Sequence, residues 1–215
     1  MAAGQVTPAG SGSPGIVGIL ISGRGSNMLA IADACAAGRI AARVGIVISN
    51  EPGAPGLAAA RQRGIETLVL DHRESRGRQE YDARLAAALD RHSVDLVCLA
   101  GYMRLLSPGF VAERAGRIMN VHPALLPAFP GLHAQRQAVE HGVRLSGATV
   151  HFVDAGLDSG PIILQAAVPV EQDDTEETLS ARILVEEHRL YPEAIRLHFE
   201  HRLRIEGRRV RILGR

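Results

Sequence analysis

The stretch that decides the fold is Ile16-Val17-Gly18-Ile19-Leu20-Ile21, followed directly by Ser22-Gly23-Arg24-Gly25-Ser26-Asn27. The first six residues are apolar without alternation, which is typical of a strand covered on both faces in a parallel sheet. The next six form a glycine-rich turn, and a helical pattern from Asn27 to Ala37 follows it and ends at Gly38. The stretch therefore predicts the strand–turn–helix start of an α/β fold.

The same alternation continues along the chain. We expect further strands at 44–48, 67–70, 94–100, 118–121, 148–153 and 162–170, and helices at 54–63, 79–92 and 134–140. A long helix should begin near Thr175 with Asp174 as its N-cap, and Pro192 should kink or break it. A hairpin turning at Glu206-Gly207 should end the chain. This order predicts a doubly wound, mostly parallel sheet of the Rossmann-like type.

Composition bounds both the organisation and the chemistry. The 215 residues are 46% hydrophobic, enough for one core, so we expect a single domain at 15–215 after a disordered leader at 1–14 rich in Gly, Ala, Ser and Pro. Within that domain we expect two halves, at 15–101 and 102–215. All 24 basic residues are arginine, which excludes Schiff-base lysine catalysis and the Gly-Lys pair of a nucleotide-triphosphate P-loop.

Charge and cysteine content favour a cytoplasmic protein that acts on small molecules. The net charge of +1 gives no concentrated basic face for nucleic acid, and the apolar runs are too short to span a membrane. The two cysteines, Cys35 and Cys98, are far apart and indicate a reducing compartment. A homodimer is possible. We expect no metal, because the nine histidines show no zinc-ligand spacing.

The glycine-rich turn suits a phosphate group. Its glycines allow an anion to approach the backbone, and the helix that follows offers free N–H groups and the positive end of its dipole. Gly25, Ser26 and Asn27 are the candidate phosphate-binding residues. Two other interpretations remain: a merely tight turn, or a dinucleotide site in which Glu51 binds the ribose. A dinucleotide fingerprint would need a third glycine where Met28 stands.

The most chemically suggestive stretch is Asn120-Val121-His122-Pro123. Alternation along a strand points Asn120 and His122 to the same face, and Pro123 ends the strand. Such a pair can hold a developing oxyanion, although a histidine that is merely satisfied in a turn is the simpler alternative. The turn-rich loop 153–161 carries two acids, Asp154 and Asp158, and a carboxylate brought near His122 would favour the charged form of that ring. A lone carboxylate there is otherwise a turn former.

Together these motifs resemble phosphoribosylglycinamide formyltransferase, the folate-dependent enzyme of purine synthesis, over about residues 16–200. The likeness is carried by the turn 22–27, Ala100-Gly101-Tyr102-Met103-Arg104-Leu105-Leu106-Ser107-Pro108, Asn120 to Pro127, and Asp154 to Gly160. The Asn-x-His motif with a later Leu-Asp-x-Gly-Pro is shared by folate formyltransferases generally, whereas the Gly-Ser-Asn turn is specific for the glycinamide substrate.

The resemblance implies that 15–101 form a phosphate-binding half and 102–215 a folate-binding and catalytic half. It also implies roles for individual residues. Asn120, His122 and Asp158 would be catalytic; Gly25, Ser26 and Asn27 would bind the substrate phosphate, and Glu187 the glycinamide portion. The residues that would bind 10-formyltetrahydrofolate, the cosubstrate, are Arg78, Met103, Arg104, Leu105, Leu106, Asn120, Asp154, Ala155, Gly156, Leu157 and Asp158. The sequence departs from the family pattern at Arg24, Gln135 and Leu184. Alternative functions are another 10-formyltetrahydrofolate-dependent formyltransferase or hydrolase, and a non-enzymatic nucleotide-binding module.

Overall fold

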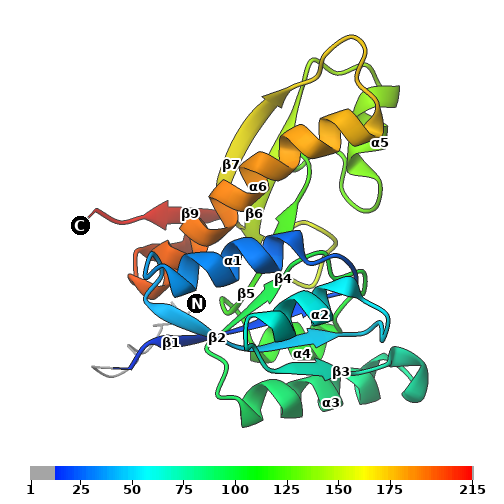
Figure 1. Ribbon diagram of the computed structural model, residues 1–215. Helices are drawn as coiled ribbons and strands as arrows, with labels where there is room; N and C mark the ends of the chain where they lie inside the picture. The colour runs from blue at the N-terminus through cyan, green and yellow to red at the C-terminus, as the bar shows by residue number, and fades with distance from the viewer. Residues whose placement is uncertain (1–12, 215) are drawn as a thin grey trace.

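A nine-stranded sheet runs through the computed structural model, which describes residues 13–214 (Figure 1). Its strands are β1 (Gly15–Ile21), β2 (Ala42–Ser49), β3 (Thr67–Val69), β4 (Leu96–Leu99), β5 (Ile118–His122), β6 (Leu145–Phe152), β7 (Ile162–Pro169), β8 (Leu203–Glu206) and β9 (Arg209–Ile212). The helices are α1 (Ser26–Ala36), α2 (Pro55–Gln62), the 3-10 turn η1 (His72–Glu74), α3 (Arg78–Arg91), α4 (Pro108–Glu113), α5 (Ala134–Glu140) and α6 (Glu176–Phe199). The leader predicted at 1–14 lies, as far as residue 12, outside the described residues.

The strands of the sheet change from parallel to antiparallel after β5. Its order is β3-β2-β1-β4-β5-β6-β7-β9-β8, and the first five of these strands are parallel. Strand β6 runs antiparallel to both β5 and β7, and β9 joins β7 through a single parallel bridge, Ile162 to Arg209. The predicted α/β class with a mostly parallel sheet is confirmed. The register of β5 and β6 places Asn120 opposite His151 and His122 opposite Thr149.

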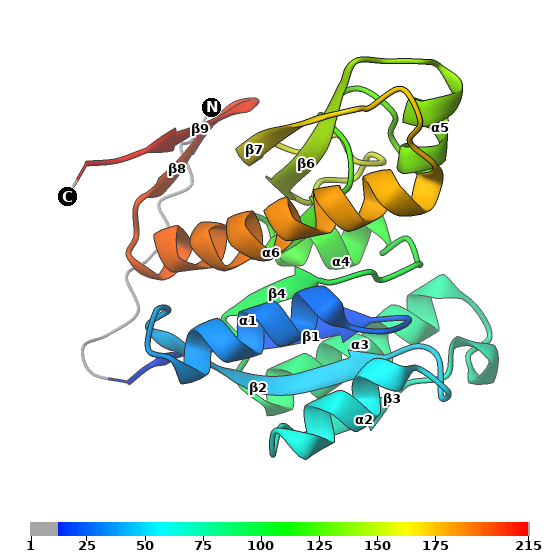
Figure 2. The same ribbon diagram turned by 45° about the horizontal axis from the view of Figure 1, so that its top comes forward.

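Helices cover both faces of the sheet (Figure 2). A hydrophobic core lies on each face. The larger core packs side chains of α1, α2, α5 and α6 against the sheet, and the smaller one packs α3 and α4. Tyr191 of α6 is fully buried, and its hydroxyl lies 3.1 Å from the carbonyl oxygen of Leu99 and 2.8 Å from that of Met119. This contact fixes α6 over the central strands β4 and β5.

Three local expectations are corrected by the structure. The N-cap of α6 is Thr175 rather than Asp174, and Thr175 forms a capping box with Thr178. Asp174 instead accepts hydrogen bonds from Arg182, at 2.8 and 3.0 Å, which hold the pKa of its carboxyl well below the usual range. Pro192 does not break α6, since buried residues on both sides of it hold the helix against the sheet. Helix α4, whose Ser107 N-cap precedes Pro108, was not predicted.

Within residues 13–214, no helix is both long enough and apolar enough to cross a membrane.

Candidate active site

The glycine-rich turn presents an open helix N-terminus. Gly25 is the N-cap of α1 in the left-handed region, with φ of 76°, and no side chain caps the helix. A Cβ at Gly25 would lie 3.0 Å from the Met28 side chain and 3.1 Å from the Gly56 Cα atom, so the position requires glycine. The turn lines a pocket of about 250 Å³ together with Ala100, Gly101 and Met103. Its free N–H groups suit an anion.

Asn27 and Glu187 meet at the floor of this region, although 160 residues separate them in the chain. The Asn27 Nδ2 atom donates a 2.6 Å hydrogen bond to Glu187 Oε2, and both side chains are buried. Burial raises the pKa of Glu187, while the bond from Asn27 and the nearby His122 act in the opposite direction. Asn27 Oδ1 is buried and has no hydrogen-bond partner among the described residues. A bound N–H donor would satisfy that oxygen.

The three predicted catalytic side chains come together at the β5–β6 pairing. His122 Nδ1 lies 3.4 Å from Asp158 Oδ2, and Asn120 Nδ2 lies 3.5 Å from Asp158 Oδ1. Asp158 has φ of 48° and also accepts a 2.8 Å hydrogen bond from the Gly131 N–H. The other nitrogen of His122, Nε2, lies 2.8 Å from the Phe129 carbonyl oxygen. Because that oxygen can only accept, His122 carries a proton on Nε2.

His151 is a fourth member of this cluster, and sequence reasoning missed it. Its Nδ1 lies 2.9 Å from the Phe152 carbonyl oxygen and must therefore donate, which leaves a lone pair on Nε2 in the neutral ring. Asn120 Nδ2 lies 3.2 Å from that Nε2 and donates to it. Burial lowers the pKa of His151, which favours the neutral form. The available signal was the pattern of Thr149 and His151, two polar residues on one face of an apolar strand.

Thr149 anchors the loop that follows β5. Its hydroxyl donates to the Ala124 carbonyl oxygen at 2.6 Å and accepts from the Leu126 N–H at 3.1 Å. Gln165 Nε2 donates to the Leu126 carbonyl oxygen at 2.9 Å from the next strand. These buried bonds fix the start of the loop that carries Phe129 and Gly131 past the catalytic cluster.

Exposed apolar side chains border the predicted cosubstrate segments. Met103, Leu105 and Leu157 are 64%, 56% and 53% exposed, although soluble domains usually cover such side chains. Leu106 and Val153, at the bases of the two segments, pack against the same core. Uncovered apolar surface of this kind fits a flat, partly apolar ring such as a pterin.

The loop 154–158 owes its shape to local bonds. Asp154 Oδ1 accepts hydrogen bonds from the Gly156 N–H at 3.0 Å and from the Ser159 hydroxyl at 2.7 Å. A Cβ at Gly156 would lie 2.1 Å from the Ser159 hydroxyl oxygen, so the turn depends on glycine. Ala155, Gly156 and Leu157 are exposed at its tip, and Asp158 follows toward His122.

The structure gives less support to two of the predicted cosubstrate contacts, those of Arg104 and Arg78. The Arg104 guanidinium lies over the Tyr81 ring at 5.0 Å from its centroid, so this side chain is engaged within the protein. Arg78 is the exposed first residue of α3, and no interaction found among the described side chains links it to the catalytic cluster. Its predicted contact with the outer part of the folate stays a prediction.

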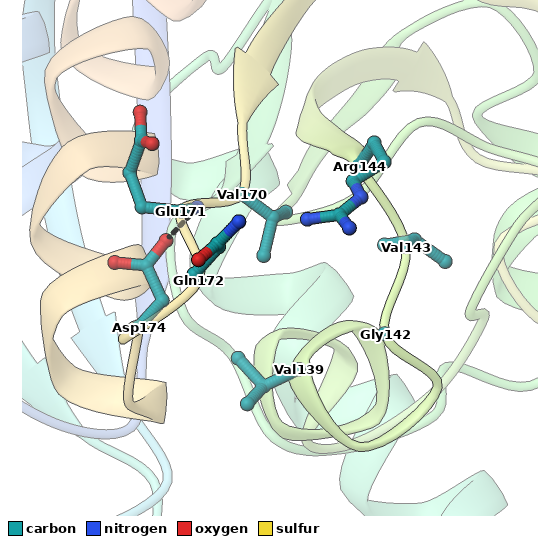
Figure 3. A pocket seen from close by; sticks show the side chains of 8 residues that line it. All are labelled: Val139, Gly142, Val143, Arg144, Val170, Glu171, Gln172 and Asp174. Atoms are coloured by element: carbon teal, nitrogen blue, oxygen red, sulfur yellow. Dashed lines mark hydrogen bonds between the residues drawn. The ribbon is translucent and has the colours of Figure 1, made fainter.

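A second hollow, of about 270 Å³, lies between α5, β6 and the start of α6 (Figure 3). Its lining residues are Val139, Gly142, Val143, Arg144, Val170, Glu171, Gln172 and Asp174. None of the catalytic or phosphate-turn residues lines it, and its buried carboxylate, Asp174, is already paired with Arg182. Within the part of the chain that the structure describes, no group of three or more His, Cys, Asp or Glu side chains is arranged to hold a metal ion.

Comparisons with known proteins agree with this geometry. A family model described as formyl transferase matches residues 16–195. Phosphoribosylglycinamide formyltransferase of Escherichia coli is 48% identical over 87% of this chain and 88% of its own length. The crystal structure of glycinamide ribonucleotide transformylase 1 from Symbiobacterium toebii is 59% identical, with a TM-score of 0.91 over 93% of this chain and 94% of that one.

A longer relative shares only this unit. The trifunctional purine biosynthetic protein adenosine-3 of Drosophila melanogaster is 52% identical over 83% of this chain, which spans 13% of that protein's length. The similarity therefore concerns one part of the trifunctional protein.

Proposed function

The chain belongs to the phosphoribosylglycinamide formyltransferase family, and from this premise we propose how its own residues transfer a formyl group from 10-formyltetrahydrofolate to the amine of glycinamide ribonucleotide. The observation that carries the proposal is the Asn27–Glu187 pair, which joins the open N-terminus of α1 to the surroundings of His122. The substrate's phosphate would bind Gly25, Ser26 and Asn27, and its glycinamide portion would lie at Glu187. The buried Asn27 Oδ1 would accept a substrate N–H.

Catalysis, in this proposal, is electrostatic and needs no covalent enzyme intermediate. The neutral amine attacks the formyl carbon and forms a tetrahedral oxyanion. Asn120 Nδ2 and protonated His122 would stabilise the oxyanion, because fixed donors at the point where charge develops lower the barrier. Asn120 would use the proton that otherwise faces Asp158 Oδ1 at 3.5 Å and keep its bond to His151. Asp158 Oδ2, 3.4 Å from His122 Nδ1, would orient the ring by accepting a hydrogen bond from that nitrogen. The bond between the formyl carbon and the folate nitrogen then breaks, and the amine's proton passes to that nitrogen through His122 or a water held by Asp158.

His122 must give up its hydrogen bond to the Phe129 carbonyl oxygen before it can act in this way. Its Nε2 proton lies against the Phe129 carbonyl oxygen at 2.8 Å. We propose that substrate binding moves the loop that carries Phe129, so that the Nε2–H turns to the oxyanion. Phe129 has φ of 51°, a conformation that non-glycine residues adopt rarely, which is consistent with a segment that changes shape.

The cosubstrate would lie between the segments 103–106 and 154–158. Met103, Leu105, Leu106 and Leu157 would cover the pterin, and Arg78 would contact the outer part of the folate. Arg104, Asp154, Ala155 and Gly156 would contribute through the backbone of the two segments. We propose a cytoplasmic location, consistent with the unpaired Cys35 and Cys98, and a possible homodimer whose existence size-exclusion chromatography with light scattering would test.

The proposed function is tested by following 10-formyltetrahydrofolate consumption with three acceptors in parallel. We expect turnover with glycinamide ribonucleotide, and none with water alone or with initiator methionyl-tRNA. Turnover with water alone would identify a hydrolase, and turnover only with the charged tRNA would identify the other transferase. Binding of the ribonucleotide without any turnover would leave only a nucleotide-binding module.

The catalytic assignment is tested by Asn120→Ala and Asp158→Ala. Each should lower kcat by roughly two or more orders of magnitude, the usual scale for an oxyanion donor and its support. KM for the ribonucleotide should change much less, because neither side chain holds the phosphate turn. A near-normal kcat in either variant, with an unchanged circular dichroism spectrum, would refute these roles.

A further inference from the structure

Ser22 lies where the phosphate turn meets the cosubstrate segment. It follows β1 directly, and its backbone N–H donates a 3.0 Å hydrogen bond to the Gly101 carbonyl oxygen. Its hydroxyl oxygen accepts a 2.8 Å hydrogen bond from the Met103 N–H. Gly101 has φ of 73°, so the chain turns sharply after β4, and Met103 lies just past that turn. One residue therefore holds the 101–103 turn at two points.

The direction of the hydroxyl bonds is fixed by a third partner. The Ser22 hydroxyl lies 2.6 Å from Asn50 Oδ1, which can only accept, so the single hydroxyl proton points to Asn50. Asn50 is 3% exposed, and its amide is oriented by a 3.2 Å bond from Nδ2 to Glu51 Oε1. Because the Ser22 hydroxyl donates its only proton to Asn50, its oxygen lone pairs are left to accept from the Met103 N–H. The Ser22 hydroxyl is not free to donate to a phosphate.

We propose that Ser22, oriented by Asn50, is a positioning residue that sets the backbone of Met103 for the folate cosubstrate. Met103 is the most exposed apolar side chain of the 103–106 segment, so its position depends on its backbone anchor rather than on core packing. The inference rests on the proposed function, since it assumes that this segment binds the cosubstrate. It assigns to a residue of the phosphate turn a role in the other substrate's site.

The test is steady-state kinetics of Ser22→Ala, with each substrate varied at saturation of the other. The variant keeps the Ser22 N–H bond to Gly101 and loses the bond to Met103. We expect KM for 10-formyltetrahydrofolate to rise roughly five- to tenfold, the scale of one or two lost hydrogen bonds. KM for the ribonucleotide should change less than twofold, and kcat at saturation should stay within about threefold of the wild-type value.

Two further variants separate positioning from general stability. Ser22→Thr keeps a hydroxyl and should restore most of the wild-type KM. Thr178→Ala removes a hydroxyl in the α6 capping box that accepts from the Thr175 N–H at 2.9 Å and bonds neither Asn50 nor Met103, so it should leave both KM values unchanged. The double variant Ser22→Ala/Asn50→Ala should have no higher KM than Ser22→Ala alone, because Asn50 acts through Ser22.

The outcomes are distinct. A selective rise in the folate KM that Ser22→Thr reverses supports the inference. An unchanged folate KM in Ser22→Ala, or an equal change in both KM values that Thr178→Ala reproduces, overturns it. If the wild-type protein itself fails to transfer formyl groups to the ribonucleotide, the proposed function fails instead, and the wild-type arm reports this separately.

Discussion

At the scale of single residues, we expect His151 to act through one lone pair. The bond from its Nδ1 to the Phe152 carbonyl oxygen fixes the tautomer, and the free Nε2 accepts from Asn120. His151→Phe keeps much of the volume and removes the acceptor, so the Asn120 amide loses an orienting bond. We expect kcat to fall roughly tenfold, with little change in either KM.

The matched control is His151→Gln, whose side-chain oxygen can take the place of Nε2. It should recover a large part of kcat. A wild-type kcat in His151→Phe would show that Asn120 does not need His151 as a partner. Stopped-flow measurement of the first turnover would distinguish slower chemistry from slower product release.

We expect ionised Glu187 to lower the free energy of unfolding, although the same side chain is predicted to bind the substrate. Burial raises its pKa, so above the ordinary carboxyl value the folded state binds more protons than the unfolded chain. This contribution to stability is present at low pH and is lost as the pH rises through the raised pKa. Glu187→Gln should therefore gain Tm relative to wild type as the pH rises from 4.5 to 8, by about 2–4 °C for each kcal/mol relieved.

The same variant should raise KM for the ribonucleotide roughly tenfold, because a charge-assisted hydrogen bond is lost. Differential scanning calorimetry across this pH range checks the first effect and steady-state kinetics the second. A Tm difference that does not depend on pH would mean that Glu187 titrates normally.

Sequence reasoning could find Asn120 and His122 because both lie on one short strand with a fixed alternation. Asp158 and Glu187 came from family resemblance, since no local pattern places a loop or a helix face beside a strand end. His151 was missed because its role depends on the antiparallel register of β5 and β6. That register is a tertiary property, and the sequence predicted two strands without predicting how they pair.

At the scale of elements, the start of α1 depends on the backbone of Gly25. Gly25→Ala would place a Cβ in the left-handed region and against Met28 and Gly56. We expect KM for the ribonucleotide to rise at least tenfold and Tm to fall by several degrees, on the scale of a strained backbone position. Gly53→Ala is the control, because its Cβ would meet no atom within 4 Å.

Helix boundaries were predicted where local signals dominate and failed where packing or competition decides. Residues 134–140 formed the expected helix. The cap of α6 was misassigned because Asp174 and Thr175 are both good caps, and Arg182 takes the carboxylate of Asp174. Pro192 was expected to kink or break α6, but the helix continues past it, because burial of Tyr191, Ala194 and Ile195 outweighs the hydrogen bond that proline cannot donate.

At the scale of the whole molecule, three buried or partly buried histidines should make the fold sensitive to acid. Burial, aided by His201 and opposed by Asp95, lowers the pKa of His198 to about 4, and burial also lowers those of His151 and His188. Between about pH 4 and 6.5 the unfolded chain binds more protons, so stability is full above pH 6.5 and is lost as the pH falls.

Urea unfolding at pH 7, 5.5 and 4.5 should therefore show a falling free energy of unfolding. His198→Gln should flatten this dependence, whereas His133→Gln, at a side chain that is 60% exposed, should not. Equal pH slopes for His198→Gln and wild type would place the acid sensitivity elsewhere.

The uninterrupted sheet limits how this enzyme can move. Strands β4 and β5 pair across the midpoint of the chain, so the ligand regions of the two halves rest on a common rigid platform. Many enzymes exclude water by hinged closure of one lobe on another. Within residues 13–214, one continuous sheet joins the two halves, so we expect no such hinge between them. Shielding of the reaction must come from peripheral segments alone, and their opening rate would then set how fast products leave.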